Sequence, residues 1–172
     1  SEGMILAAGP GGQDLWLEPV DGSAARAKVT NLGSASGAIA FQRALGDRLI
    51  FESAGRLGSV PKSARDDSQA LLLTPASLTV TDVFAISEDV LVVYVIGPAG
   101  SALASVSTSD PDSFVILSDQ SSSVSWDTSW RTSDGWIAFE EFTSANIDQV
   151  VVVRPGDAPS RRVISPLGVN TD

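Results

Sequence analysis

The sequence contains no cysteine and no histidine. The lack of cysteine excludes disulfides, thiolate nucleophiles and thiolate metal sites within this chain. The lack of histidine excludes an intrachain Ser-His-Asp triad, the usual zinc sites and imidazole acid–base catalysis. Because these absences remove the commonest hydrolase and metalloenzyme sites, we expect no catalytic residues, no metal and no cofactor.

Long apolar runs and clustered cations are also absent. The longest apolar stretch, Val90–Ile96, has the length of a strand, whereas a membrane-spanning helix needs roughly 20 residues. Eleven Lys and Arg against 21 Asp and Glu give a net charge of −10. Nucleic acids and anionic membranes attract clustered positive charge, so neither is an expected partner. Cysteine content does not decide the compartment, and we favour an extracytoplasmic location, periplasmic or secreted.

The residues that are present favour short strands joined by turns. Hydrophobic residues make up 43% of the chain and charged residues 19%, which is typical of a globular protein. Fifteen Gly and nine Pro accompany many Ser, Thr and Val, a combination suited to turns and β-strands.

A turn followed by an apolar strand occurs four times. The equivalent turn residues are Gly3, Asp47, Asp89 and Gly135, and their successive spacings are 44, 42 and 46 residues. A period of about 40–45 residues is typical of a β-propeller blade.

Two further matches support the same period. Leu15–Gly22 aligns without a gap with Val150–Asp157, which begins 135 residues later, the length of three repeats. Phe41, Phe84 and Trp130 precede the apolar strand by nearly the same distance in the last three repeats, with one extra residue after Phe41.

Each repeat is therefore expected to fold as a four-stranded antiparallel blade of an all-β, propeller-like domain. The repeats cover approximately residues 1–36, 37–78, 79–123 and 124–172, and the first blade lacks its first strand. Lys62–Gln69 is a polar insertion in the second repeat, where a tight turn is expected. We favour a section of a larger propeller over a four-bladed ring completed by Pro166–Asp172, because propellers close by sharing strands between their ends.

Two stretches, Asp14–Gly22 and Ser129–Phe139, resemble the TolB-type propeller repeat, a WD-repeat-like family. In that family a Trp-containing strand leads through an Asp-Gly turn into an Ile-Ala-Phe strand. A Leu-Trp strand, a second Asp-Gly turn and a terminal Leu-Thr follow. The resemblance is strong at Gln13–Thr30 and Ser129–Ser165 and rests on spacing in the second and third repeats. It implies a β-propeller that serves protein–protein interaction, or a propeller domain that gates a peptidase.

Trp126, Asp127, Trp130 and Arg131 are the candidate partner-binding residues. They fall in the first strand of the fourth repeat, which in a propeller lines the central channel. Aromatic and arginine side chains carry much of the binding energy of protein interfaces. The alternative is that Trp126 is an ordinary packed residue beside a loop.

The other tryptophans stand at positions where the repeat itself requires aromatic residues. We expect Trp16, Trp130 and Trp136 to pack between adjacent blades, because a buried indole removes a large apolar area from water.

The acidic residues form no expected catalytic or metal site. Asp110 and Asp112 lack the full ligand spacing of a calcium loop, which favours a plain turn. Asp66-Asp67 has the character of a solvated loop tip. Glu140 and Glu141 are neighbours on a predicted strand and point to opposite faces, so they cannot form a glycosidase pair.

The sequence thus predicts a non-enzymatic β-propeller scaffold that mediates protein–protein interaction. The expected partner is a protein, with a second copy of the chain as one option. One alternative is the propeller section of a larger prolyl-oligopeptidase-like hydrolase. The other is a carbohydrate-binding module that uses Trp126 and Trp130.

Overall fold

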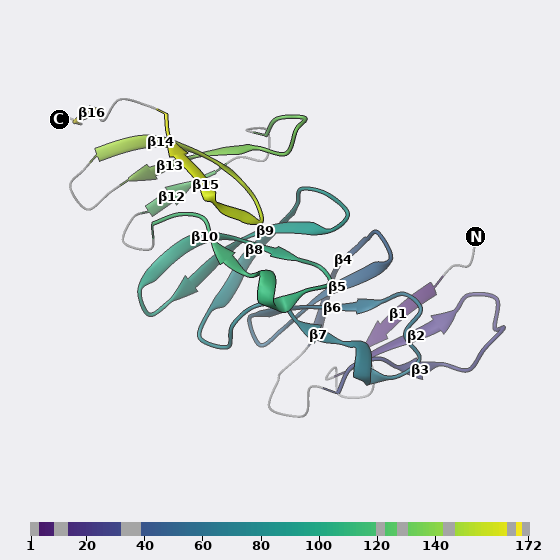
Figure 1. Ribbon diagram of the computed structural model, residues 1–172. Helices are drawn as coiled ribbons and strands as arrows, with labels where there is room; N and C mark the ends of the chain where they lie inside the picture. The colour runs from purple at the N-terminus through teal and green to yellow at the C-terminus, as the bar shows by residue number, and fades with distance from the viewer. Residues whose placement is uncertain are drawn as a thin grey trace. The chain divides into compact units, whose positions relative to one another are not determined.

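The computed structural model describes residues 4–8, 14–31, 39–119, 123–126, 131–142, 147–164 and 168–169. Most of these residues lie in strands, and both of the described helices are short 3-10 turns (Figure 1). Within these ranges, no helix has the length and hydrophobicity needed to cross a membrane. The chain divides into two compact units, Ser1–Pro75 and Ala76–Asp172, which are described one after the other.

The first unit contains two antiparallel sheets whose strands are neighbours in chain order. The first sheet has three strands, as expected for a blade without its first strand: β1 (Met4–Ala8), β2 (Leu15–Pro19) and β3 (Ala27–Lys28). The second sheet has four: β4 (Ile39–Leu45), β5 (Arg48–Ser53), β6 (Arg56–Pro61) and β7 (Leu71–Leu72).

The second unit repeats this plan. Its first sheet consists of β8 (Thr79–Ala85), β9 (Val90–Gly97), β10 (Gly100–Ser107) and β11 (Val115–Ile116). Its second sheet consists of β12 (Ser123–Ser125), β13 (Ile137–Phe142), β14 (Ile147–Arg154) and β15 (Asp157–Val163), and β16 (Gly168–Val169) also pairs with β14. The four predicted blades are therefore confirmed as four successive sheets.

One hydrogen bond recurs at the end of successive sheets. In each of the first three, a backbone N–H donates to a buried hydroxyl that follows the last strand, at 2.9, 3.0 and 2.8 Å. The donor–acceptor pairs are Leu15–Thr30, Leu57–Thr74 and Leu103–Ser118. We call the Thr30, Thr74 and Ser118 side chains the closing hydroxyls.

A backbone hydrogen bond beside the closing hydroxyls extends the repeat to the fourth sheet. The carbonyl oxygens of Leu15, Leu57 and Leu103 each accept from the residue before the closing hydroxyl, and Val150 accepts from Ile164 in the same way. Leu15 and Val150 are 135 residues apart, the offset at which the sequence aligns with itself. The period read from the sequence is therefore also the period of the hydrogen bonding.

The extra residue after Phe41 is absorbed by a β-bulge. The register of β4 against β5 shifts between Phe41 and Arg43, and Phe41 lies opposite Phe51. A bulge adds a residue to one strand without changing which faces the flanking side chains occupy.

The predicted insertion Lys62–Gln69 is not peculiar to the second repeat. It contains the 3-10 turn η2 (Asp67–Gln69), and the third repeat has a matching turn, η3 (Pro111–Ser113), at the same place between its last two strands. In both, an aspartate accepts from a backbone N–H two residues later, Asp66 from Ser68 and Asp110 from Asp112. A capped 3-10 turn therefore replaces the expected tight turn, because the aspartate satisfies the N–H groups that the turn leaves open.

Strand alternation decides which tryptophan is buried, and the prediction for Trp16 and Trp136 is wrong. On β2, Leu15 and Leu17 face the core of the first unit, so Trp16 lies on the opposite face. Trp16 and Trp136 are both half-buried, and an arginine guanidinium lies over each ring, at 5.0 Å and 5.9 Å from the centroid. Trp130 lies outside the described residues.

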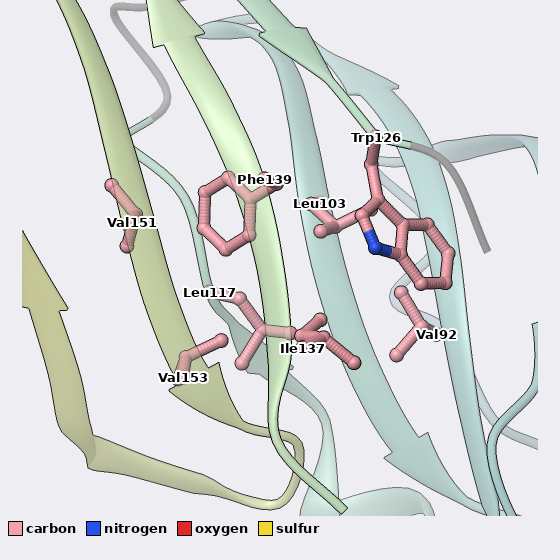
Figure 2. Close-up of a cluster of buried hydrophobic side chains, with 8 residues drawn as sticks. All are labelled: Val92, Leu103, Leu117, Trp126, Ile137, Phe139, Val151 and Val153. Carbon is pink, nitrogen blue, oxygen red and sulfur yellow. The ribbon is translucent and has the colours of Figure 1, made fainter. Parts of the chain in front are cut away.

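A cluster of buried apolar side chains packs the two sheets of the second unit together (Figure 2). Strands of both sheets contribute side chains to this cluster. In the view of Figure 2, the Trp126 indole and the valines of β14 lie on opposite sides of the cluster. Its members are Val92, Leu103, Leu117, Trp126, Ile137, Phe139, Val151 and Val153.

Candidate functional site

The predicted partner-binding residues do not form one exposed patch within the described part of the chain. Trp126 is only 9% exposed and meets Phe84 edge-on, with ring centroids 4.8 Å apart. An indole buried to this extent offers no open ring face to a sugar or a partner. Asp127 and Trp130 lie outside the described residues. Arg131 is exposed, and it lines a pocket that does not include Trp126.

Arg131 lines an open pocket of about 580 Å³, whose described lining residues belong to turns and strand ends. This volume lies within the about 300–1,000 Å³ that ligand pockets usually have. We call it the turn pocket, and its lining residues are Ile86, Ser87, Val90, Arg131, Thr132, Ser133, Asp134, Gly135, Arg154 and Pro155.

Strand order explains why residues so far apart in sequence meet there. The first and second strands of a sheet are joined at one end, and antiparallel order places the turn between the third and fourth strands at that same end. The β14–β15 turn therefore lies at the same end of its sheet as the 132–136 turn before β13. The β8–β9 turn of the neighbouring sheet forms the remaining side of the turn pocket.

The 132–136 turn is held by its own hydrogen bonds. The backbone N–H of Thr132 donates to the Trp136 carbonyl at 2.9 Å, and the Gly135 N–H donates to the Thr132 carbonyl at 3.2 Å. The Thr132 hydroxyl donates to the Asp134 carboxylate. Gly135 has φ +88°, a conformation that side-chain-bearing residues rarely adopt, so glycine is required at this position.

Hydrogen bonding also lowers the pKa of the acid in this turn. The Thr132 hydroxyl lowers the pKa of Asp134 below its ordinary value of 3.8, and the nearby Arg154 guanidinium lowers it further. Asp134 is therefore ionised at neutral pH.

The β14–β15 turn is fixed to the neighbouring sheet. The Gly156 N–H donates to the buried Ser105 hydroxyl of β10 at 2.9 Å, across 51 residues of sequence. Arg154 begins this turn and donates from Nη2 to the Asp134 carbonyl at 2.9 Å. The β14–β15 turn is thus hydrogen-bonded both to β10 and to the 132–136 turn.

Two exposed guanidinium groups are the main electrostatic feature of the turn pocket. Arg131 donates from Nη1 to the Ala85 carbonyl at 3.3 Å, and Arg154 donates to the Asp134 carbonyl. Neither forms an ion pair within 4.0 Å with a carboxylate of the described residues. A carbonyl orients a guanidinium without cancelling its charge, and each Arg has five N–H groups to share. Both arginines can therefore bind an anionic group.

A second ionic site, around Glu141, is closed to ligands. Glu141 has no exposed side chain and accepts from the Asp119 N–H, from Gln149 Nε2 and from Arg161 Nη2. Glu140 is only half-buried, which confirms that the two adjacent glutamates face opposite ways. Glu141 ties the two sheets of the second unit together.

No described group of three or more acidic residues could hold a metal ion. Of the two predicted residues that the structure describes, Trp126 and Arg131, only Arg131 lines the turn pocket. Sequence analysis missed Arg154 and Asp134 as site residues. Both residues could have been predicted from the repeat, because it places their two turns at the same end of one blade.

Comparison with known proteins identifies the fold and no family. No family model matches the sequence, and no curated protein matches it. Oligopeptidase B from Leishmania major is structurally similar, with a TM-score of 0.54 and 12% identity over 99% of this chain and 28% of that chain. A post-proline cleaving enzyme from Rickettsia typhi gives a TM-score of 0.53 and 9% identity over 98% of this chain and 27% of that one.

These similarities confirm the fold class predicted from the sequence. The structural neighbours are β-propeller domains, and this chain has the same antiparallel blades. The chain spans less than a third of the length of either enzyme. At such low identity, the likeness carries fold and not activity.

Proposed function

We propose that this chain is a section of a larger β-propeller and acts as a non-enzymatic scaffold that binds a protein partner at the turn pocket. The observation that carries the proposal is the pair of exposed guanidinium groups, Arg131 and Arg154, in a chain with a net charge of −10. Arginine is enriched among the residues that dominate protein interfaces. The surrounding turns are fixed by hydrogen bonds, so little entropy is lost when a partner orders them.

Site-specific crosslinking tests this proposal. A photoreactive residue is placed at Ser133, which lines the turn pocket, and in a control at Ser101, which is exposed at the opposite end of its sheet. We expect one protein to crosslink from Ser133 and not from Ser101. That protein is then identified, purified and titrated with the wild-type chain and with an R131E/R154E variant.

The expected result is at least tenfold weaker binding by the double variant. An R26E variant is a matched control, because Arg26 is also exposed but belongs to the first unit. Equal affinity of the wild-type chain and the R131E/R154E variant would show that the turn pocket is not the binding surface.

The propeller section of a larger prolyl-oligopeptidase-like hydrolase is the second candidate. Its support is the fold similarity to two peptidases across nearly all of this chain. A serine-reactive fluorophosphonate probe, applied to the natural gene product that contains these residues, distinguishes the two. Labelling outside the present sequence, together with cleavage of a proline-containing peptide, would favour the hydrolase. A gene product that shows neither labelling nor cleavage would favour the scaffold.

A further inference from the structure

We propose that the turn pocket binds a peptide segment through an aspartate or glutamate carboxylate, with an apolar residue next to it. This inference rests on the proposed function and specifies the ligand of the same site. It follows from the donors that the pocket presents, the apolar residues beside them and the rigidity of the turns that carry both.

The donors are arginines whose existing hydrogen bonds leave their charge intact. Arg131 uses Nη1 for the Ala85 carbonyl, and Arg154 uses Nη2 for the Asp134 carbonyl. A guanidinium binds a carboxylate through two parallel N–H···O bonds, which are about twice as strong as bonds between neutral groups. Because each guanidinium is oriented in advance, it loses less freedom when the carboxylate arrives.

The described residues that line the turn pocket carry a net positive charge, although the chain is acidic and Glu88 and Asp89 lie in the adjoining β8–β9 turn. The ionisable residues in that lining are Arg131, Arg154 and Asp134. Asp134 accepts the Thr132 hydroxyl, and its charge offsets one of the two arginines. One net positive charge remains, so a single carboxylate completes the pocket, whereas a polyanion is repelled by the rest of the protein.

The apolar part of the lining indicates what accompanies the carboxylate. Ile86 and Val90 line one side, and Pro155 follows Arg154 on another. All three are half-buried, so each still has apolar surface to cover. A free inorganic anion would leave these surfaces in water, whereas a peptide with an apolar neighbour covers them.

The pocket is also preorganised across two sheets. The Gly156–Ser105 hydrogen bond holds the β14–β15 turn against β10, and the Arg131–Ala85 bond holds the other wall to the end of β8. Preorganised sites bind more tightly because fewer groups are ordered on binding.

An NMR titration of the wild-type chain tests the ligand class without any mutation. The probes are three blocked peptides, acetyl-Gly-Asp-Leu-Gly-amide, the same peptide with Asn for Asp, and the same peptide with phosphoserine for Asp. We expect saturable shifts of the Thr132 and Gly135 amides with the Asp peptide, and at least tenfold weaker binding of the Asn peptide. The R131Q/R154Q variant should also lose at least tenfold, and R26Q should lose nothing.

Two outcomes would overturn the inference. Equal binding of the Asp and Asn peptides would show that the turn pocket does not recognise the carboxylate. Tenfold tighter binding of the phosphoserine peptide would show that it is a phosphate site. Crosslinking at Ser133 separates this failure from failure of the proposed function. In one outcome, a partner binds at the turn pocket without being displaced by the Asp peptide. That result would support the proposed function and contradict the carboxylate ligand.

Discussion

Glu141 and Arg161 form an ion pair with a distance of 2.5 Å between Oε2 and Nη2, in which the Glu141 side chain is fully buried and the Arg161 side chain is 33% exposed. Glu141 lies on β13 and Arg161 on β15, with β14 between them. Gln149 of the middle strand donates to the same oxygen at 2.8 Å. Three strands and the backbone of Asp119 thus converge on one carboxylate.

Removing Arg161 leaves that buried charge less compensated. We expect R161A to lower the free energy of unfolding by about 1.5–3 kcal/mol, the usual contribution of a hydrogen bond to a charged group. R162A is the matched control, because Arg162 is exposed and only lies over Trp136. Urea unfolding measures both, and equal midpoints at an unchanged m-value would contradict the prediction.

The closing hydroxyl of the second sheet gives a second prediction. T74V keeps the size of the side chain but leaves the buried Leu57 N–H without its acceptor, which costs about 1–3 kcal/mol. T74S keeps the hydroxyl and should lose about 0.8 kcal/mol or less, the value of one buried methylene group. Hydrogen exchange at the Leu57 amide should be faster in T74V only. If T74V and T74S are equally stable, the bond contributes nothing.

Two glycines provide a test of packing. A Cβ at Gly58 would overlap the buried Phe51 ring and lie 2.9 Å from the Leu71 carbonyl oxygen. We expect G58A to cost about 1–3 kcal/mol, as overpacked cores do. At Gly97 the added atom meets the methyl end of Leu78, which can rotate away. Thermal unfolding should therefore show a larger loss for G58A than for G97A, and the reverse order would be inconsistent with this packing.

The 132–136 turn gives a prediction that depends on pH. The Thr132 hydroxyl holds the pKa of Asp134 below 3.8, so this bond contributes stability above that pH and loses it as pH falls through the lowered pKa. In T132V the pKa of Asp134 should rise toward 3.8. Carboxyl ¹³C chemical shifts measured against pH report it directly. An unchanged pKa of Asp134 in T132V would show that the Thr132 hydroxyl does not cause the lowering.

The blades were predictable because their signals are local. Turns such as Asp134-Gly135 and apolar strands such as Val90–Gly97 recur at a fixed period, and backbone pairing follows from that order. The C-terminal boundaries were less predictable. The last hairpin strand, β15, already begins at Asp157, because the turn that precedes it lies at Pro155-Gly156.

The burial of individual side chains was harder to predict, because it depends on contacts distant in sequence. Trp126 is buried because Phe84 of the neighbouring sheet meets its ring. Glu141 looks like a surface residue until the register brings Gln149 opposite it and Arg161 beside it. The turn pocket could not be foreseen from composition, since its two arginines belong to different turns and are 23 residues apart.

The closing hydroxyls have a consequence for how blades are duplicated within such a gene. Thr74 and its donor Leu57 belong to one blade, so a duplicated segment that ends just after Thr74 carries both partners to the new copy. A recombination breakpoint between them would separate donor from acceptor and leave a polar group orphaned in the interior. Viable crossovers should therefore fall immediately after the closing hydroxyls Thr30, Thr74 and Ser118.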